Sequence, residues 1–150
     1  MLHTQYEWQQ RVKNVEREFL AIQLATDRLM DASTRDPSVF SGDMRARSLR
    51  EAAAKLDGTY LIRLFAEFET CLRLFWPAAR LTDPPSRTRD LIDGIAATRR
   101  IPNDRLKNVH DVRDYRNSLV HLREKETTAL SVAEARGHLC KFLSHLPPRW

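Results

Sequence analysis

The sequence predicts an all-α fold, and its composition is the first observation that does so. The 150 residues include 19 Leu and 15 Ala against 7 Val and 5 Ile, with 4 Gly. Leu and Ala favour helices, whereas β-branched residues favour strands. The second observation is that apolar residues recur every three to four positions over most of the chain, which is typical of amphipathic helices. We therefore expect one domain over residues 1–150, a bundle of five to six helices that are mostly antiparallel.

The first expected helix is long and spans residues 4 to about 32. Thr4 and Glu7 form a capping-box pattern, in which a hydroxyl and a carboxylate satisfy each other's backbone donors. The apolar residues that follow lie at helical multiples. Residues 33–42 contain a proline and a glycine among small polar residues, so we expect a loop there.

Two helices are expected in the next part of the chain. The shorter one runs from Asp43 to about Leu56 and is stopped by Asp57-Gly58. Thr59 begins the most apolar helix, and Pro77 is expected to end it because proline lacks a backbone donor. Its apolar stripe should be the centre of the core and consists of Leu61, Leu64, Phe65, Phe68, Cys71, Leu72 and Phe75.

Three shorter helices complete the expected bundle. The first runs from about Arg87 to Arg99. The second covers about 103–123, with Pro102-Asn103-Asp104 supplying its cap. The last runs from Ser131, which forms a capping-box pattern with Glu134, to about Leu146.

Several protein classes are excluded by composition. Cys71 and Cys140 cannot build a disulfide framework, and neither belongs to a Cys-x-x-Cys pair, so disulfide-rich secreted proteins and zinc ribbons are excluded. We also expect no metal and no cofactor. No apolar run approaches the roughly 20 residues of a membrane span. The first residues do not combine a basic region with an apolar stretch, so we expect no secretory signal and a cytoplasmic location.

The net charge of +5 comes from 20 Arg and 5 Lys against 20 acidic residues. The planar guanidinium matches a phosphate better than an ammonium does, so the arginines hint at a phosphate-bearing partner. The alternative is that they are solvated helix faces and ion pairs.

The most informative segment lies in the helix expected at 103–123. At 100° per residue, its apolar side chains should face the core, namely Val109, Val112, Tyr115, Leu119 and Leu122. The adjoining arc holds two guanidiniums, an amide and two imidazoles, from His110, Arg113, Arg116, Asn117 and His121. Arg116 and His121 lie about 140° apart around the axis and about 7.5 Å along it, so they can flank a phosphate but not bond each other.

The residues Arg116-Asn117-Ser118-Leu119-Val120-His121 resemble the Arg-x(4–6)-His motif of the HEPN superfamily, in its Arg-Asn-x-x-x-His form. The resemblance implies a small helical bundle and a metal-independent endoribonuclease, of the kind found in toxin–antitoxin and other prokaryotic defence systems. It also implies a homodimer whose two motifs meet in one composite active site.

The resemblance further implies a role for each polar residue of the motif helix. His121 would act as general base or acid on RNA, and Arg116 would hold the scissile phosphate. Asn117 would orient His121 or donate to the phosphate, and Arg113 would be an auxiliary phosphate contact or a salt-bridge residue. Cleavage through the 2′-hydroxyl would leave a 2′,3′-cyclic phosphate.

Other readings stay open. A non-catalytic HEPN-like subunit that binds nucleic acid or nucleotides, or that scaffolds a partner, would carry the same motif. A basic DNA-binding protein is less favoured, because Pro102 is unsuited to the turn before a recognition helix. On the most apolar helix, Glu69 and Arg73 are expected to be an exposed pair, whereas Glu67 could face a cleft.

One departure from the family pattern concerns regulation. In HEPN toxins paired with a nucleotidyltransferase antitoxin, the motif often continues as His-x-Tyr, and the tyrosine is modified. Arg123 stands at that position here. Regulation by that modification is not expected, while a nucleotidyltransferase or another antitoxin stays possible as a partner.

Overall fold

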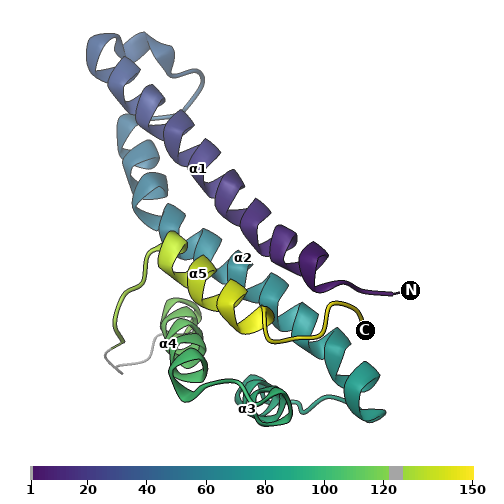
Figure 1. Cartoon of the computed structure of the whole chain (residues 1–150). Coiled ribbons are helices and arrows are strands. Elements are labelled where there is room, and N and C mark those ends of the chain that lie inside the picture. Colours follow the sequence, from purple (N-terminus) through teal and green to yellow (C-terminus); the bar gives the residue numbers. More distant parts are fainter. Residues whose placement is uncertain (1, 122–126) are drawn as a thin grey trace.

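The computed structural model describes residues 2–121 and 127–150. In these ranges the chain forms five α-helices and one short 3-10 helix (Figure 1). They are α1 (Gln5–Arg35), η1 (Pro37–Val39), α2 (Ala46–Arg80), α3 (Thr88–Arg99), α4 (Asn103–Val120) and α5 (Val132–Leu143). The described residues contain no strand, apart from an isolated bridge between Thr4 and Arg149. The expectation of an all-α bundle is confirmed.

Both capping boxes form as the sequence predicts. At the start of α1, the backbone N–H of Glu7 donates to Thr4 Oγ1 (3.2 Å), and the Thr4 N–H donates to Glu7 Oε2 (3.1 Å). Ser131 and Glu134 repeat the arrangement at α5, with distances of 3.1 and 2.9 Å. The hydrogen bonds from Ser131 hold the pKa of Glu134 below its ordinary value. Each cap satisfies backbone donors that the first helical turn leaves without partners.

The second part of the chain differs from the expectation, because α2 is one helix of 35 residues. Asp57-Gly58 does not stop it, and Pro77 lies inside its last turn. A glycine within a helix costs about 1 kcal/mol, which tertiary contacts can offset. Here Gly58 lies against α4, where an added Cβ would be 3.4 Å from a methyl of Leu119. After Pro77 the helix ends at Leu81, whose φ of 55° is left-handed and whose N–H donates to the carbonyl of Pro77 (2.9 Å).

The buried residues form one cluster, and α2 supplies more of them than any other helix. The apolar stripe expected from the sequence is buried throughout, and Trp76 extends it. The rings of Phe68 and Phe142 meet edge-on at 5.5 Å between centroids, which joins α2 to α5. Cys71 and Cys140 are also buried, and burial raises the pKa of both thiols. The expected centre of the core is therefore confirmed.

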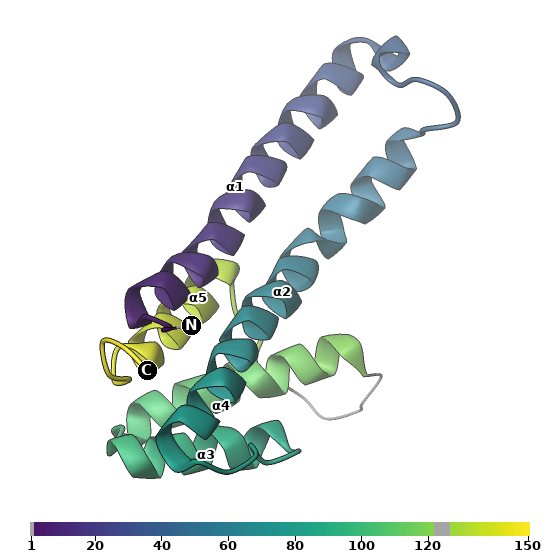
Figure 2. The same cartoon turned by 90° about the vertical axis from the view of Figure 1, so that its right-hand side faces the viewer.

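The far halves of α1 and α2 form an arm that projects away from α3, α4 and α5 (Figure 2). We call residues 20–53 the helical arm. Every one of these residues is described, and none of them is buried. The arm thus lies outside the core, which gathers where α5 and α4 pack on the near halves.

The three remaining helices lie close to their expected positions. α3 begins at Thr88 and ends at Arg99. α4 ends at Val120, and Leu122 and Arg123 lie outside the described residues. α5 ends at Leu143, earlier than the expected Leu146. None of the helices within the described ranges combines the length and the apolar character that a membrane span requires.

The start of α1 binds the C-terminal end of α5, the last helix of the bundle. The Gln5 side-chain amide donates to the carbonyls of Leu143 (3.1 Å), Ser144 (2.9 Å) and Leu146 (2.7 Å). These acceptors lie at the C-terminal end of α5, where helix carbonyls lack intrahelical partners. Backbone hydrogen bonds between His3 and Trp150, at 2.9 and 3.0 Å, extend this contact. We call it the Gln5 clasp.

The contact between α2 and α3 is close enough to require a glycine. A Cβ added at Gly94 would lie 2.7 Å from two atoms of the Trp76 ring. That ring is held in place on two sides, because its Nε1 donates to Thr82 Oγ1 (3.2 Å) and Arg80 stacks on it with Cζ 4.6 Å from the centroid. It therefore has little room to move away from an added methyl group.

We expect Gly94→Ala and Gly137→Ala to change stability in opposite directions. Both glycines are helical, but a Cβ at Gly137 would meet nothing within 4 Å. Gly137→Ala should raise the free energy of unfolding by roughly 0.5–1 kcal/mol. At Gly94 an overpacking cost of about 1–3 kcal/mol exceeds that gain. Urea unfolding of both variants tests this, and a Gly94→Ala protein as stable as the Gly137→Ala protein would contradict the contact with Trp76.

Candidate functional site

The candidate site is an open groove between α2 and α4, with a volume of about 380 Å³. Val109 and Val112 are buried and fix α4 against the core, and this orientation turns Arg116 towards α2. The groove is lined by Ile62, Ala66, Glu69, Thr70, Arg73, Arg116 and Val120. Its walls thus combine small apolar side chains with two guanidiniums and one carboxylate.

Arg116 is held in the groove by three contacts. Its Nη2 donates to Glu69 Oε2 (3.0 Å), and its Nη1 donates to Asn117 Oδ1 (3.0 Å). Its Cζ lies 4.7 Å from the centroid of the Phe65 ring, within the range of a cation–π contact. A guanidinium has five N–H donors, and the Nε–H and one hydrogen on each terminal nitrogen have no bond among the described residues. Arg116 is therefore oriented while donors remain available to an anion.

Glu69 connects three helices. Its Oε1 accepts from Arg73 Nε (3.0 Å) and Nη2 (2.7 Å) and from Thr88 Oγ1 (2.9 Å), while Oε2 accepts from Arg116. Arg73 also donates to the carbonyls of Pro85 (3.0 Å) and Ser86 (3.2 Å), and so ties down the connector before α3. The orientation of Arg116 therefore depends on a carboxylate that is itself fixed from two sides.

Two expectations about the acidic residues of α2 need correction. The pair between Glu69 and Arg73 forms, but it is not exposed, since the Glu69 side chain is only 18% accessible. The link to Arg116 was missed, because spacing along α2 reveals neighbours on the same helix and not on α4. Glu67, which could have faced a cleft, instead pairs with Arg11 of α1 (3.0 Å).

His121 lies just past the end of the motif helix. It caps α4 with extended φ and ψ of −114° and 130°, and its N–H donates to the carbonyl of Asn117 (2.9 Å). Its side chain is exposed and does not line the groove that holds Arg116. The amide oxygen of Asn117 accepts from Arg116, so the expected orientation of His121 by Asn117 is not seen in the described contacts. Within the described part of one chain, His121 and Arg116 therefore do not line the same groove.

Arg113 faces α3 rather than the groove. It is 9% exposed, and its Nε and Nη2 donate to Asp114 Oδ1 (3.2 and 2.6 Å). Its Nη1 donates to His110 Nδ1 (2.8 Å), and the other ring nitrogen of His110 lies 2.6 Å from Asp93 Oδ1. Since a guanidinium only donates, these contacts assign the proton of neutral His110 to Nε2, directed at Asp93. Arg113 is thus bound within the fold and makes no contact with the groove.

Two apolar residues of the motif helix are exposed next to the site. The sequence predicts that Leu119 faces the core, but it is 39% exposed, and Val120 is 48% exposed. Both follow the last buried positions of α4, where α2 continues into the helical arm and no further helix covers them. The expected core face of α4 is therefore correct up to Tyr115, which is partly buried, and wrong at Leu119.

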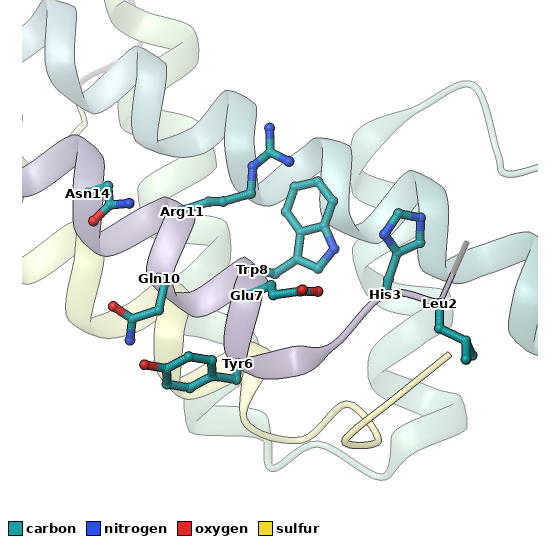
Figure 3. A pocket seen from close by; sticks show the side chains of 8 residues that line it. All are labelled: Leu2, His3, Tyr6, Glu7, Trp8, Gln10, Arg11 and Asn14. Carbon is teal, nitrogen blue, oxygen red and sulfur yellow. The ribbon is translucent and has the colours of Figure 1, made fainter.

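A second cavity, of about 480 Å³, lies at the start of α1 and holds no motif residue (Figure 3). Arg11 stacks on Trp8 there, with Cζ 4.6 Å from the ring centroid, and also pairs with Glu67. The cavity is lined by Leu2, His3, Tyr6, Glu7, Trp8, Gln10, Arg11 and Asn14. This cavity holds one guanidinium and one carboxylate, whereas the groove between α2 and α4 holds two guanidiniums and one carboxylate, so the groove is the stronger candidate for binding an anion.

No protein family, curated protein or solved structure matches this chain. The resemblance to HEPN proteins therefore depends on residues 116–121 and on the helical fold. Within the described residues, no group of three His, Cys, Asp or Glu side chains is placed to hold a metal ion.

Proposed function

We propose that the protein is a metal-independent endoribonuclease of HEPN type, acting as a toxin-like or defence component in the prokaryotic cytoplasm. One observation carries the proposal. Arg116 is oriented by Glu69 and Phe65 in an open groove and keeps unused donors, and an exposed imidazole follows five residues later at the helix end. Cleavage of a phosphodiester through the 2′-hydroxyl requires a fixed cation beside the phosphate and a general acid or base that transfers protons.

In the proposed reaction, His121 takes the proton of the RNA 2′-hydroxyl. The 2′-oxygen attacks the adjacent phosphorus, the bond to the 5′-oxygen breaks, and the leaving oxygen takes a proton from an imidazolium or from water. Arg116 donates two hydrogen bonds to the phosphate oxygens and stabilises the charge that builds up on them. The products are a 2′,3′-cyclic phosphate and a 5′-hydroxyl.

The proposed active site is shared between two copies of the chain. His121 does not line the groove of its own Arg116, so a second copy supplies the imidazole or completes the cavity. Leu119 and Val120 give this face the exposed apolar surface that a homodimer buries. An antitoxin, a nucleotidyltransferase or another protein, would act by covering this face.

Incubation of the purified protein with RNA in EDTA tests the proposal. We expect cleavage with cyclic-phosphate ends, and loss of that cleavage in both Arg116→Ala and His121→Ala. Cleavage that needs added metal, or that survives His121→Ala, would contradict the mechanism. Binding of RNA without cleavage would favour a non-catalytic HEPN-like subunit, a reading also supported by the pairing of Arg116 with Glu69, which offsets its charge.

A further inference from the structure

One face of α1 carries a regular stripe of exposed and half-buried side chains. The α1 stripe consists of Lys13, Arg17, Leu20, Leu24, Asp27 and Asp31. These positions are spaced alternately by four and three residues, which places them on one side of the helix. At 100° per residue the stripe lies about 130° from the buried face of α1, which is formed by Trp8, Val12, Val15 and Phe19.

The apolar centre of the α1 stripe is uncovered. Leu20 and Leu24 are 52% and 56% exposed. α5 lies alongside the first half of α1, where Gln9 donates to the carbonyl of Cys140 (3.4 Å) and Arg136 pairs with Glu16. Leu20 and Leu24 belong to the helical arm, beyond these contacts. Large apolar side chains exposed next to one another on a helix are typical of a contact surface.

The charges of the α1 stripe are arranged so that the stripe complements itself. Two basic residues precede the leucines, and two acidic residues follow them. The members of each pair lie at equal distances from position 22: Leu20 with Leu24, Arg17 with Asp27, and Lys13 with Asp31. An antiparallel second copy, related by a two-fold axis at position 22, would therefore place every basic residue opposite an acidic one and every leucine opposite a leucine.

We propose that a second copy of this chain docks on the α1 stripe in antiparallel orientation. A two-fold contact forms each pairing twice, so four ion pairs surround four leucines. A parallel arrangement would set like charges against each other, and the charge pattern therefore selects the antiparallel one. In the part of the chain that the structure describes, Lys13, Arg17, Asp27 and Asp31 form no ion pair, so their charges are available.

This contact is separate from the proposed shared active site. α1 packs on α2, α5 and η1 and makes no contact with α4 among the described residues. Docking on the α1 stripe consequently leaves the groove around Arg116 open. The proposal goes beyond the proposed function and does not depend on it, because the chain can associate through the α1 stripe whether or not it cleaves RNA.

A charge-exchange experiment tests this docking. The variant Asp27→Arg/Asp31→Lys has a wholly basic stripe, and the variant Lys13→Glu/Arg17→Glu has a wholly acidic one. We expect each variant alone to have half the molar mass of the wild type in light scattering at the same concentration, because like charges now face each other. An equimolar mixture of the two should recover the wild-type mass, since the basic stripe complements the acidic one.

Circular dichroism of each variant confirms that it is folded before its mass is measured. The proposal is overturned if either variant alone keeps the wild-type mass, or if the mixture stays at half that mass. Val120→Asp, added to both variants, serves as the matched control. It disturbs the motif face and so removes any mass that the proposed shared active site contributes, but mixing the two variants should still double their mass. RNA cleavage in the same samples reports the proposed function separately, so failure of one proposal does not conceal the other.

Discussion

Arg116→Lys is expected to lose nearly as much RNA cleavage as Arg116→Ala, with a fall in kcat of roughly 10²–10³-fold for each. A lysine keeps the positive charge, but an ammonium cannot stack flat on the Phe65 ring while it donates to Glu69 and to a phosphate. The loss should appear in kcat more than in KM, because the contact strengthens as charge develops on the phosphate. Single-turnover cleavage of a short RNA measures it.

Arg28→Ala is the matched control for this prediction. Arg28 is an exposed arginine of the helical arm, outside the groove and outside the α1 stripe. Its removal changes the net charge of the chain as Arg116→Ala does, and we expect cleavage to be unchanged. Full activity in Arg116→Lys would show that only charge matters, and the bidentate role of Arg116 would then be wrong.

Glu69→Gln is expected to weaken both the fold and the proposed activity. A neutral amide leaves Arg73 and Arg116 facing a partner without charge, and both guanidiniums are largely buried, at 33% and 22% exposed. Hydrogen bonds to charged groups are each worth about 1.5–3 kcal/mol, so the free energy of unfolding should fall by roughly 2 kcal/mol. kcat should also fall, because Arg116 loses the carboxylate that positions it.

Glu67→Gln provides the comparison on the same helix. Glu67 pairs with Arg11. The Glu67 side chain is 31% exposed against 18% for Glu69, and the Arg11 side chain is 58% exposed against 33% and 22% for Arg73 and Arg116. An exposed pair of this kind contributes about 0–1 kcal/mol, so this variant should be almost as stable as the wild type. Urea unfolding and steady-state kinetics of Glu69→Gln and Glu67→Gln compare their stability and their kcat. Equal effects of the two substitutions would contradict the distinct role of Glu69.

The sequence predicts the helices well where local chemistry determines them. The capping boxes at Thr4 and Ser131 start helices where expected, because a hydroxyl and a carboxylate three residues apart act within one turn. The breaks expected at Gly58 and Pro77 are wrong, because contacts from elsewhere hold α2 together. Leu119 packs against Gly58, and beyond Pro77 the side chain of Arg80 stacks on Trp76 and donates to the carbonyl of Gly94 (3.2 Å). The contacts with Leu119 and Gly94 involve other helices and leave no local pattern.

The same distinction applies to the candidate site, where some residues could be predicted from local spacing and others depend on how helices pack. Arg116 and His121 could be identified from their spacing and from the resemblance that this spacing carries. Glu69 could not, since it lies 47 residues before Arg116 and meets it only once α2 and α4 pack. The burial of Arg113 depends on His110 and on Asp93 of α3, and the early end of α4 at Val120 exposes His121. These features follow from how helices pack and not from the order of residues within one helix.

The Gln5 clasp has a consequence for how the protein folds during synthesis on the ribosome. The Gln5 amide binds carbonyls of residues 143, 144 and 146, which are made 138 to 141 residues after it. α5, which buries Phe142 against Phe68, is also made after α2. While the chain grows, the apolar face of α2 is not yet covered by α5. Long-range contacts of this kind form slowly. The nascent chain therefore gains its closed bundle, and with it the ordered groove around Arg116, only after α5 has been made.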